Sequence, residues 1–288
     1  MKGIIILVKK IKNKLCTKLL QIAVNLKIIP EEAILGIFPF LVRKYNVKLY
    51  HKDSFNNWSM VMFENLEHFF KTKHFYDAQP LMNALNDKIK NSNICIDVGA
   101  SIGIVSIWMA KNSKKVYSFE PELNNRKRFM ENASLNKISN IQLMPFAVSD
   151  KDGFCDLNIS RCYGHHSLAK VKASIRIGTQ KVETKTLDSF CLQNRIEHID
   201  FLKIDVEGFE LEVFKGAKKL LQQRKIKLLV FEVSKIPLKN LNRKASQLSD
   251  FLDRFGYEVL TLNEDKISRK SMDDIYFEDL IARPRYRL

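Results

Sequence analysis

Hydrophobic positions change their spacing along the chain, and after residue 93 short apolar runs alternate with stretches of helical period. The runs are rich in β-branched residues and have the length of strands, whereas the stretches between them repeat apolar residues every three or four positions. The predicted strands are 93–97, 115–119, 141–146, 199–205 and 227–233, and the predicted helices are 102–110, 123–136 and 211–221. Because strands that alternate with helices require crossover connections, we predict an α/β fold around a mostly parallel sheet.

Two later segments depart from this alternation. Residues 155–188 contain short strand-like pieces, one of them 181–186, and we expect them to form an insertion beside the active site. Near the end, a predicted helix over 245–254 is followed by two strand-like segments, 257–262 and 274–282. Two consecutive strands suit a closing antiparallel hairpin, which completes a predicted sheet of seven strands.

The first 90 residues follow a different pattern, and we predict that residues 1–90 form a basic, mainly helical N-terminal extension. Apolar residues recur there at intervals of three and four, with lysines between them, at Ile4, Val8, Ile11, Leu15, Leu19, Ile22 and Leu26. Such a helix can lie on an anionic membrane through residues 1–27; an ordinary helix packed on the main domain is the alternative. The apolar runs are far shorter than the roughly 20 residues of a spanning helix, so we expect no transmembrane segment.

Half of the formal net charge of +16 lies in this extension. Residues 1–50 hold ten Lys or Arg and two Glu, which gives +8. This charge attracts an anionic partner, either a membrane surface or a polyanion, away from the predicted catalytic domain. The five cysteines form no CxxC pair, so we expect neither a zinc site nor a disulfide framework. Without a recognisable secretory signal, we expect a cytoplasmic protein that is at most peripheral at the membrane.

Residues 97–103, Asp-Val-Gly-Ala-Ser-Ile-Gly, follow a predicted strand and open a predicted helix. This is where an α/β sheet binds a nucleotide-like ligand, although a merely tight turn is the structural alternative. Gly99 lets the backbone turn tightly and approach the ligand without a Cβ in the way, and Gly103 permits close packing of helix on strand. The loop lacks the third glycine of the dinucleotide pattern, which makes a nicotinamide-dependent dehydrogenase the least favoured enzyme class.

Glu120 ends the next predicted strand, 23 residues after Asp97, and is followed by Pro121. A carboxylate at this position can accept hydrogen bonds from both hydroxyl groups of a ribose. The two features at matched spacing therefore predict a ligand that contains a nucleoside.

Further carboxylates follow two other predicted strands. The apolar strand that begins at Ile199 delivers Asp205, Glu207 and Glu210 to the carboxyl edge of the sheet, and Glu232 ends the neighbouring strand. Such groups can orient a hydroxyl, take its proton or share a divalent cation, for which Asp205 and Glu232 are the candidates. Capping of the following helices is the alternative.

A histidine pair lies in the predicted insertion, in the segment Gly-His-His-Ser over 164–167. The pKa of histidine lies near neutrality, so His166 can serve as a general base for a hydroxyl nucleophile. A polar turn without a catalytic role is the alternative.

With these segments in place, residues from about 93 to 235 resemble the FkbM family of S-adenosylmethionine (SAM)-dependent methyltransferases. The resemblance is carried by 96–103, Phe119-Glu120-Pro121, Ala147-Val148-Ser149, Thr186-Leu187-Asp188 and Lys203-Ile204-Asp205-Val206-Glu207-Gly208. It implies a Rossmann-like class I methyltransferase domain over 91–288, behind the extension. One departure is Ser101, where the family commonly has Asn.

The resemblance also implies which residues bind the cofactor. The methionine end of SAM is expected beside the glycine loop, the ribose on Glu120, and the adenine near residues 147–149. The implied cofactor-binding positions are Asp97, Gly99, Ala100, Ser101, Gly103, Glu120, Pro121, Ala147, Val148 and Ser149.

The implied reaction is O-methylation of a hydroxyl on a sugar, glycan, lipid-linked saccharide or secondary metabolite, through in-line attack on the sulfonium methyl group. The catalytic candidates are Asp205, Glu207, Glu232 and His166. Asp205 is the first choice for orienting or deprotonating the acceptor, with a divalent cation shared with Glu232 as an option.

Two other function classes remain open from the sequence. The basic charge is compatible with an RNA methyltransferase, but we find neither an Asn-Pro-Pro-Tyr or Asp-Pro-Pro-Tyr segment nor an RNA-binding module, and expect no nucleic-acid partner. A non-catalytic SAM-binding or membrane-associated scaffold is the second alternative. Acidic residues at three strand ends argue against it.

Overall fold

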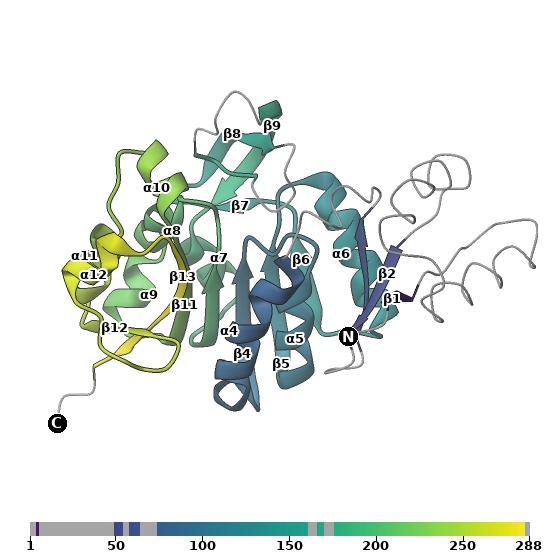
Figure 1. Cartoon of the computed structure of the whole chain (residues 1–288), viewed down its shortest axis with the longest axis horizontal. Coiled ribbons are helices and arrows are strands. Elements are labelled where there is room, and N and C mark those ends of the chain that lie inside the picture. The colour runs from purple at the N-terminus through teal and green to yellow at the C-terminus, as the bar shows by residue number, and fades with distance from the viewer. Residues whose placement is uncertain are drawn as a thin grey trace, which may run out of the picture.

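A sheet of seven strands forms the centre of the computed structural model (Figure 1), which describes residues 4–5, 49–53, 58–63, 74–160, 166–169 and 176–285. Its strand order is β12-β13-β11-β10-β4-β5-β6. The strands are β4 (Ser92–Val98), β5 (Ser113–Phe119), β6 (Ile141–Met144), β10 (Ile199–Ile204), β11 (Ile226–Ser234), β12 (Tyr257–Thr261) and β13 (Phe277–Pro284). Neighbours from β6 to β11 are parallel, and β13 is antiparallel to β11 and β12. The predicted mostly parallel sheet with its closing hairpin is therefore confirmed.

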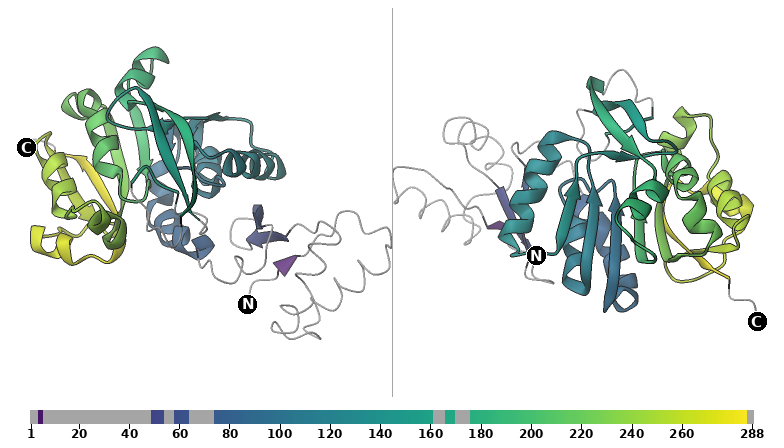
Figure 2. Two further views of the ribbon diagram at one scale, coloured as in Figure 1. Left: turned by 90° about the horizontal axis from the view of Figure 1, so that it is seen from above. Right: turned by 180° about the vertical axis from the view of Figure 1, so that it is seen from behind.

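Helices cover both faces of this sheet (Figure 2). They are α4 (His74–Ile89), α5 (Ile104–Asn112), α6 (Leu123–Leu135), α7 (Leu187–Gln193), α8 (Glu210–Gly216), α9 (Lys218–Gln222), α10 (Lys235–Asn240), α11 (Ser246–Asp253) and α12 (Arg269–Asp274). Consecutive strand residues point to opposite faces, so Phe201 packs with α4 and α5 while Leu202 packs with α7, α8 and α11. The continuous apolar runs of the sequence reflect strands that are buried on both sides.

The predicted helix over 211–221 is divided into α8 and α9. A Cβ at Gly216, where α8 ends, would lie 2.0 Å from the carbonyl oxygen of Ser149. The backbone of another segment thus passes directly against the helix end, a tertiary contact that periodicity alone does not reveal.

Helix α4 contributes to the core of the sheet domain, although it lies before residue 90. Its Leu81 and Leu85 are buried in one cluster with Trp108 of α5 and Phe201 of β10. The Trp108 and Phe201 rings meet edge to face, with centroids 5.7 Å apart. The domain boundary at residue 90 stays a prediction, but this helix packs with the residues that follow it.

Before residue 74 the structure describes three short strands, β1 (Ile4–Ile5), β2 (Leu49–Asp53) and β3 (Trp58–Phe63), in one antiparallel sheet. The sequence analysis did not predict them, and Ile4–Ile5 form a strand rather than the start of a helix. The rest of the predicted basic helix lies outside the described residues, as does most of the predicted membrane contact of 1–27. In the ranges described, we find no helix with the length and apolar character needed to cross a bilayer.

The predicted insertion forms a second sheet above the carboxyl ends of the central strands (Figure 1). Its strands β7 (Ala147–Val148), β8 (Gly153–Ser160) and β9 (Arg176–Lys185) are ordered β7-β9-β8. Ala147, Leu157 and Val182 form its small apolar cluster. The piece predicted at 181–186 belongs to the longer strand β9.

Candidate active site

Two adjoining cavities lie at the carboxyl edge of the sheet. The first cavity is enclosed by the ends of β4, β5 and β10, by β7 and β8, and by residues 166–168. The second cavity, about 460 Å³ in volume, lies between the ends of β4, β10 and β11, the start of β13, and helices α4 and α5. They share four lining residues, Gly99, Ser101, Asp205 and Glu207. Any group that passes between the two cavities therefore passes these residues.

The turn after β4 packs tightly against other loops. Gly99 has a φ of +83°, and a Cβ there would lie 1.8 Å from the carbonyl oxygen of Asp205. Gly103 has a φ of +91°, and its Cβ would meet the Phe129 ring of α6 at 2.8 Å. Gly99 thus allows two loops to pack together, and Gly103 allows the turn to pack on α6. From the sequence, Gly99 was expected to make room for the ligand and Gly103 to let the helix pack on the strand.

Ser101 occupies a left-handed backbone position, with a φ of +48°. Asn adopts this conformation more readily than most residues, because its short polar side chain can hydrogen-bond locally. The family's preference for Asn here thus has a backbone explanation, which Ser101 meets with more strain.

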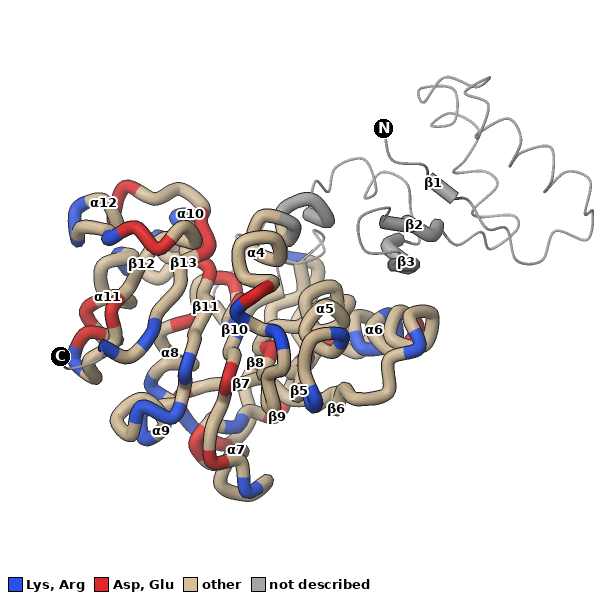
Figure 3. The backbone as a smooth tube through the Cα atoms, turned by 90° about the horizontal axis from the view of Figure 1, so that it is seen from below, with Lys and Arg blue, Asp and Glu red and all other residues tan. Residues whose placement is uncertain are grey.

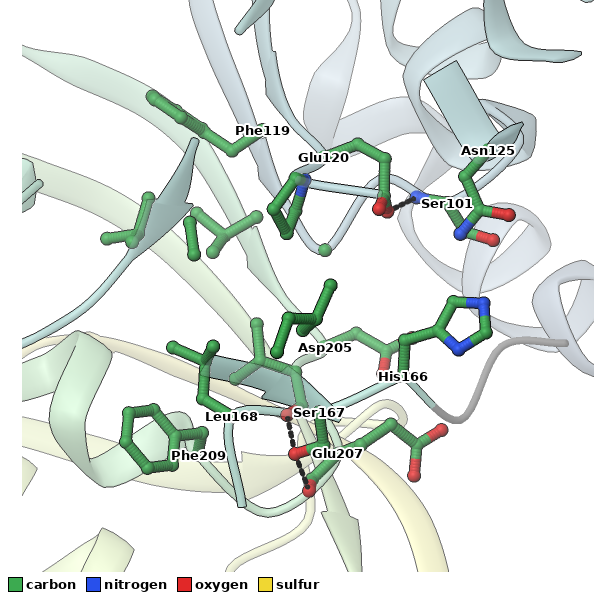
Figure 4. A pocket seen from close by; sticks show the side chains of 17 residues that line it. Ser101, Phe119, Glu120, Asn125, His166, Ser167, Leu168, Asp205, Glu207 and Phe209 are labelled. Atoms are coloured by element: carbon green, nitrogen blue, oxygen red, sulfur yellow. Dashed lines mark hydrogen bonds between the residues drawn. The ribbon is translucent and has the colours of Figure 1, made fainter. Parts of the chain in front are cut away.

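Glu120 is buried at the base of the first cavity (Figure 4). Its carboxylate accepts hydrogen bonds from the backbone N–H groups of Ser101 and Glu122, each at 2.8 Å. Burial raises the pKa of Glu120 to about 7 in spite of these two bonds. Each carboxylate oxygen of Glu120 is therefore held in place by one backbone N–H group.

Asn125 lies beside Glu120 and was not predicted. It is buried in the first turn of α6, and its N–H donates to the Glu122 carboxylate at 2.6 Å. Its Oδ1 is one of two buried side-chain oxygens without a hydrogen-bond partner within the described ranges. Because an unpaired buried polar atom is costly, this oxygen suits a donor group on a ligand in the first cavity.

The other unpartnered oxygen among the described residues is Oδ1 of Asp97. Its Oδ2 accepts a hydrogen bond of 2.5 Å from the Ser106 hydroxyl, which in turn accepts one from Ser118 at 2.8 Å. Burial raises the pKa of Asp97, and the positive charge of Lys203 opposes this shift. Asp97 borders the second cavity, where its Oδ1 can accept from a ligand amino group.

Lys203 is a buried cation that the sequence analysis quoted but did not single out. Its Nζ lies 2.8 Å from Oδ2 of Asp205, and its residue pairs in register with Asp97 on β4. Burial lowers the pKa of Lys203, but the carboxylates of Asp205, Asp97 and Asp279 raise it overall. The signal in the sequence was a lysine between two apolar residues, Leu202 and Ile204, at the end of a strand.

The structure brings three of the predicted carboxylates together. Asp205, Glu207 and Glu232 each offer one oxygen, and these oxygens lie within 4.8 Å of one another. Burial and the neighbouring carboxylates raise the pKa of Glu232 well above its ordinary value. Three hard oxygen ligands at this spacing can hold a divalent cation. Glu210 instead accepts N–H bonds from Val206 and Gly208 and fixes the loop.

His166 borders the first cavity, opposite Glu120 (Figure 4). Its Nδ1 accepts the backbone N–H of Ser160 at 3.0 Å. A neutral ring with this contact carries its proton on Nε2, so it can donate but not accept at that atom. The geometry therefore disfavours His166 as a general base, because its acceptor nitrogen is already used.

Next to it, Ser167 connects the insertion to the loop after β10. Its hydroxyl lies 3.2 Å from the carbonyl oxygen of Val206 and 2.9 Å from that of Glu207, and it accepts the N–H of Ala169. The residue after it, Leu168, lines the first cavity. The described part of the insertion thus lies over the first cavity rather than over the second.

Most of the other predicted positions border one of the cavities. Pro121, Ala147 and Val148 line the first cavity, and Ala100 lines the second. Gly103 and Ser149 are the two candidates that line neither.

The comparison with known families decides the identity. The family model described as "Methyltransferase FkbM domain" matches residues 97–259, more than half of the chain. The chain belongs to the FkbM methyltransferase family. This membership supports SAM as the cofactor of the matched domain.

Two curated relatives of this FkbM protein have named acceptors or positions. The 2-O-methyltransferase NoeI of Sinorhizobium fredii is 26% identical over 148 residues, which cover 46% of this chain and 60% of NoeI. The hexuronic acid methyltransferase AglP of Haloferax volcanii is 22% identical over 216 residues, which cover 73% of this chain and 84% of AglP. The chain thus spans about 60% of the length of NoeI.

Solved structures with a similar chain course include a methyltransferase FkbM from Methylobacillus flagellatus KT. It shares 16% sequence identity with a TM-score of 0.41, over 67% of this chain and 43% of that one. The family assignment rests on the sequence match.

Proposed function

We propose that this FkbM protein transfers a methyl group from SAM to a hydroxyl group of a sugar. The observation that carries the proposal is the junction of the two cavities at Asp205 and Glu207. One cavity offers the chemistry of a nucleoside site and the other offers carboxylates that can bind hydroxyl groups. The names of NoeI and AglP, a 2-O-methyltransferase and a hexuronic acid methyltransferase, support a saccharide acceptor.

In this proposal the first cavity holds the adenosine part of SAM. Glu120 accepts hydrogen bonds from the ribose hydroxyls, and Ala147 and Val148 pack near the adenine. The oxygen of Asn125 accepts from a donor on the nucleoside. The methionine part extends past Gly99 toward the second cavity, where the unpartnered oxygen of Asp97 accepts from its amino group.

The catalytic assignment starts from the cofactor's own chemistry. SAM supplies a methyl group that is already activated on a sulfonium, so the protein has to align the acceptor and remove a proton. Asp205 is placed for both tasks at the junction of the cavities. Lys203 fixes the orientation of this carboxylate through its ion pair of 2.8 Å.

The proposal includes a divalent cation bound by three carboxylates at the junction of the cavities. Asp205, Glu207 and Glu232 would hold it through hard oxygen ligands, and it would lower the cost of placing three carboxylates together. Titration of magnesium or manganese into chelator-treated protein tests it, with Glu232→Gln as the variant. A cation that binds equally well to the variant and to the wild type would contradict this part alone.

The first test measures cofactor binding. Calorimetric titration of SAM into the wild type should show saturable binding, and Glu120→Ala should weaken it by about tenfold to a hundredfold, because hydrogen bonds to a buried charge are lost. The exposed Glu197, which lines neither cavity, provides the matched control Glu197→Ala. Undiminished binding to Glu120→Ala, or no binding to a well-folded wild type, would overturn the cofactor placement.

The second test measures the transfer itself. Incubation with SAM and simple methyl hexopyranosides should release S-adenosylhomocysteine (SAH) and give an O-methyl sugar that mass spectrometry detects. Methylation of RNA but of no glycoside would favour the alternative class.

A further inference from the structure

The mouth of the second cavity carries three exposed apolar side chains. Ile236, Tyr276 and Phe277, here called the apolar rim, are 47%, 64% and 51% exposed. All three line the second cavity. Two neighbouring exposed aromatic residues at a cavity entrance are a feature of binding sites. Apolar side chains that stay in contact with water do not stabilise the fold, so a ligand that covers them gives a reason for their position.

The apolar rim is held in a fixed arrangement by the backbone. Phe277 pairs with Ser234 in the register of β13 on β11. The N–H of Lys235 donates to the carbonyl oxygen of Tyr276 at 2.9 Å, which keeps the start of α10 beside it. The backbone positions of the three residues are therefore fixed relative to one another, which keeps their side chains together at the entrance.

Below the rim, the cavity is strongly acidic. Its lining includes the carboxyl groups of Asp97, Asp205, Glu207, Glu232 and Asp279, against the single ammonium group of Lys203. In Figure 3 acidic positions gather where β10 and β11 end and β13 begins, while Lys and Arg are frequent on α6 and α9. The proposed methyl transfer assigns Asp97 to the methionine amino group, and the other four carboxyl groups are here called the carboxylate floor. The cavity thus combines an apolar entrance with a floor of hydrogen-bond acceptors.

We propose that the second cavity binds a neutral pyranoside, with one face of the sugar ring against Tyr276 and Phe277 and its hydroxyl groups on the carboxylate floor. A pyranose has a weakly positive C–H face, which matches the negative face of an aromatic ring. Its hydroxyl groups are donors, which match carboxylate oxygens. The inference rests on the proposed methyl transfer and names its acceptor class.

In the protein without a bound cation, the charge of the floor disfavours an acidic sugar. The floor holds four carboxyl groups, and among the described residues that line the cavity Lys203 supplies the one positive charge. A uronate would add one more carboxylate at short range, which disfavours binding by repulsion. A neutral sugar ring brings polar hydroxyl groups but no charge next to these carboxylates, so it meets no such repulsion.

The test uses the full chain, freed of divalent cations by a chelator and saturated with SAH, and NMR saturation transfer to methyl hexopyranosides and to methyl glucuronide. The C–H protons of one ring face of a neutral glycoside should receive the strongest saturation. Tyr276→Ala and Phe277→Ala should each weaken its binding about threefold to tenfold, in line with the energy of an aromatic contact. Tyr276→Phe keeps the ring and should bind as the wild type does.

The matched control is Phe154→Ala, which removes an equally exposed aromatic residue from β8, away from both cavities. It should leave glycoside binding unchanged, and methyl glucuronide should bind more weakly than any neutral glycoside that binds. The inference is overturned if no neutral glycoside binds, if both alanine variants bind like the wild type, or if the glucuronide binds best. Calorimetric SAH binding separates the two proposals, since its absence in folded wild type overturns the methyl-transfer proposal itself.

Discussion

The two cavities differ in how their residues are distributed along the chain. The first cavity uses segments that follow consecutive strands, such as the turn at Gly99, Glu120 after β5, and the Ala147–Val148 strand. The second cavity adds Leu81 from α4, Ile236 from α10 and Tyr276 before β13, which lie outside the recognised motifs. A cavity built from successive strand ends leaves a spacing in the sequence, whereas walls that come from distant elements do not.

They also differ in electrostatics. The first cavity has one buried carboxylate, Glu120, that two backbone N–H groups stabilise. The second cavity places carboxyl groups near one another and relieves part of the repulsion through Lys203. The first arrangement suits a fixed polar contact, and the second suits proton transfer or a cation.

Loss of Gly99 should have the largest effect, because it destroys the boundary between the two cavities. Gly99→Arg places a Cβ 1.8 Å from the carbonyl oxygen of Asp205 at a φ of +83°. We expect SAM binding to disappear and the apparent Tm to fall by several degrees. Calorimetry and thermal unfolding measure the two effects.

The control for this variant is Gly178→Ala on β9, where a Cβ meets nothing within 4 Å. It should leave SAM affinity unchanged. Normal SAM binding by Gly99→Arg would show that the two loops are not packed as described.

Asp205→Asn should reduce the rate of methyl transfer far more than it reduces SAM binding. We expect the rate of glycoside-dependent SAH release to fall about 10²- to 10⁴-fold, since the proton acceptor is lost. SAM affinity should change less than about threefold. Asp156→Asn, an exposed change on β8, is the control. Equal losses of SAM affinity and rate in Asp205→Asn would place Asp205 in the cofactor site instead.

Glu120→Gln tests the buried carboxyl group of the first cavity through the pH dependence of the protein's stability. Because burial raises the pKa of Glu120 from its ordinary 4.5 to about 7, the folded chain holds this proton more tightly than the unfolded chain. Stability should therefore fall as the pH rises from about 4.5 to about 7 and stay level above it. The contribution is about 3 kcal/mol at most.

The glutamine variant cannot ionise, so this part of the pH dependence should be absent from its apparent Tm between pH 5 and 8. Its SAM affinity should still be lower than that of the wild type. The same pH dependence in the variant and the wild type would assign it to another group, such as Glu210, whose pKa burial raises to about 8.

Ser167→Ala should have the smallest effect and tests whether the insertion serves the first cavity alone. Loss of its hydrogen bonds to the loop after β10 should cost about 1 kcal/mol and weaken SAM binding a few-fold. Glycoside affinity of the SAH complex should stay unchanged. Ser249→Ala, whose hydroxyl donates only to its own helix at 3.0 Å, is the comparison. A larger effect on the glycoside than on SAM would reverse the assignment of the insertion.

Local pattern was sufficient for most of the sheet domain. Alternating runs predicted the five parallel strands and the closing hairpin, because a buried strand needs a continuous apolar run. The break between α8 and α9 escaped prediction, since it depends on the backbone of Ser149 touching Gly216. The basic pattern at the N-terminus gave no sign of β2 and β3.

In the candidate site, too, some residues could be recognised from local spacing and others only from the structure. The spacing of Asp97 and Glu120 could be recognised because each residue follows its own strand directly. The contact of His166 with Ser160 argues against a role as general base, and the unpartnered oxygen of Asn125 suggests a ligand contact. Both observations require coordinates.

By itself, the sequence determined the α/β fold, the FkbM resemblance and the nucleoside chemistry, because these depend on short-range spacing. The tertiary structure alone decided which residues line the second cavity. Strand β13 inserts between β11 and β12, which carries Tyr276, Phe277 and Asp279 to the side of Lys203, more than seventy residues earlier in the chain. Strand order follows from the packing of the whole sheet, so no local pattern encodes this neighbourhood.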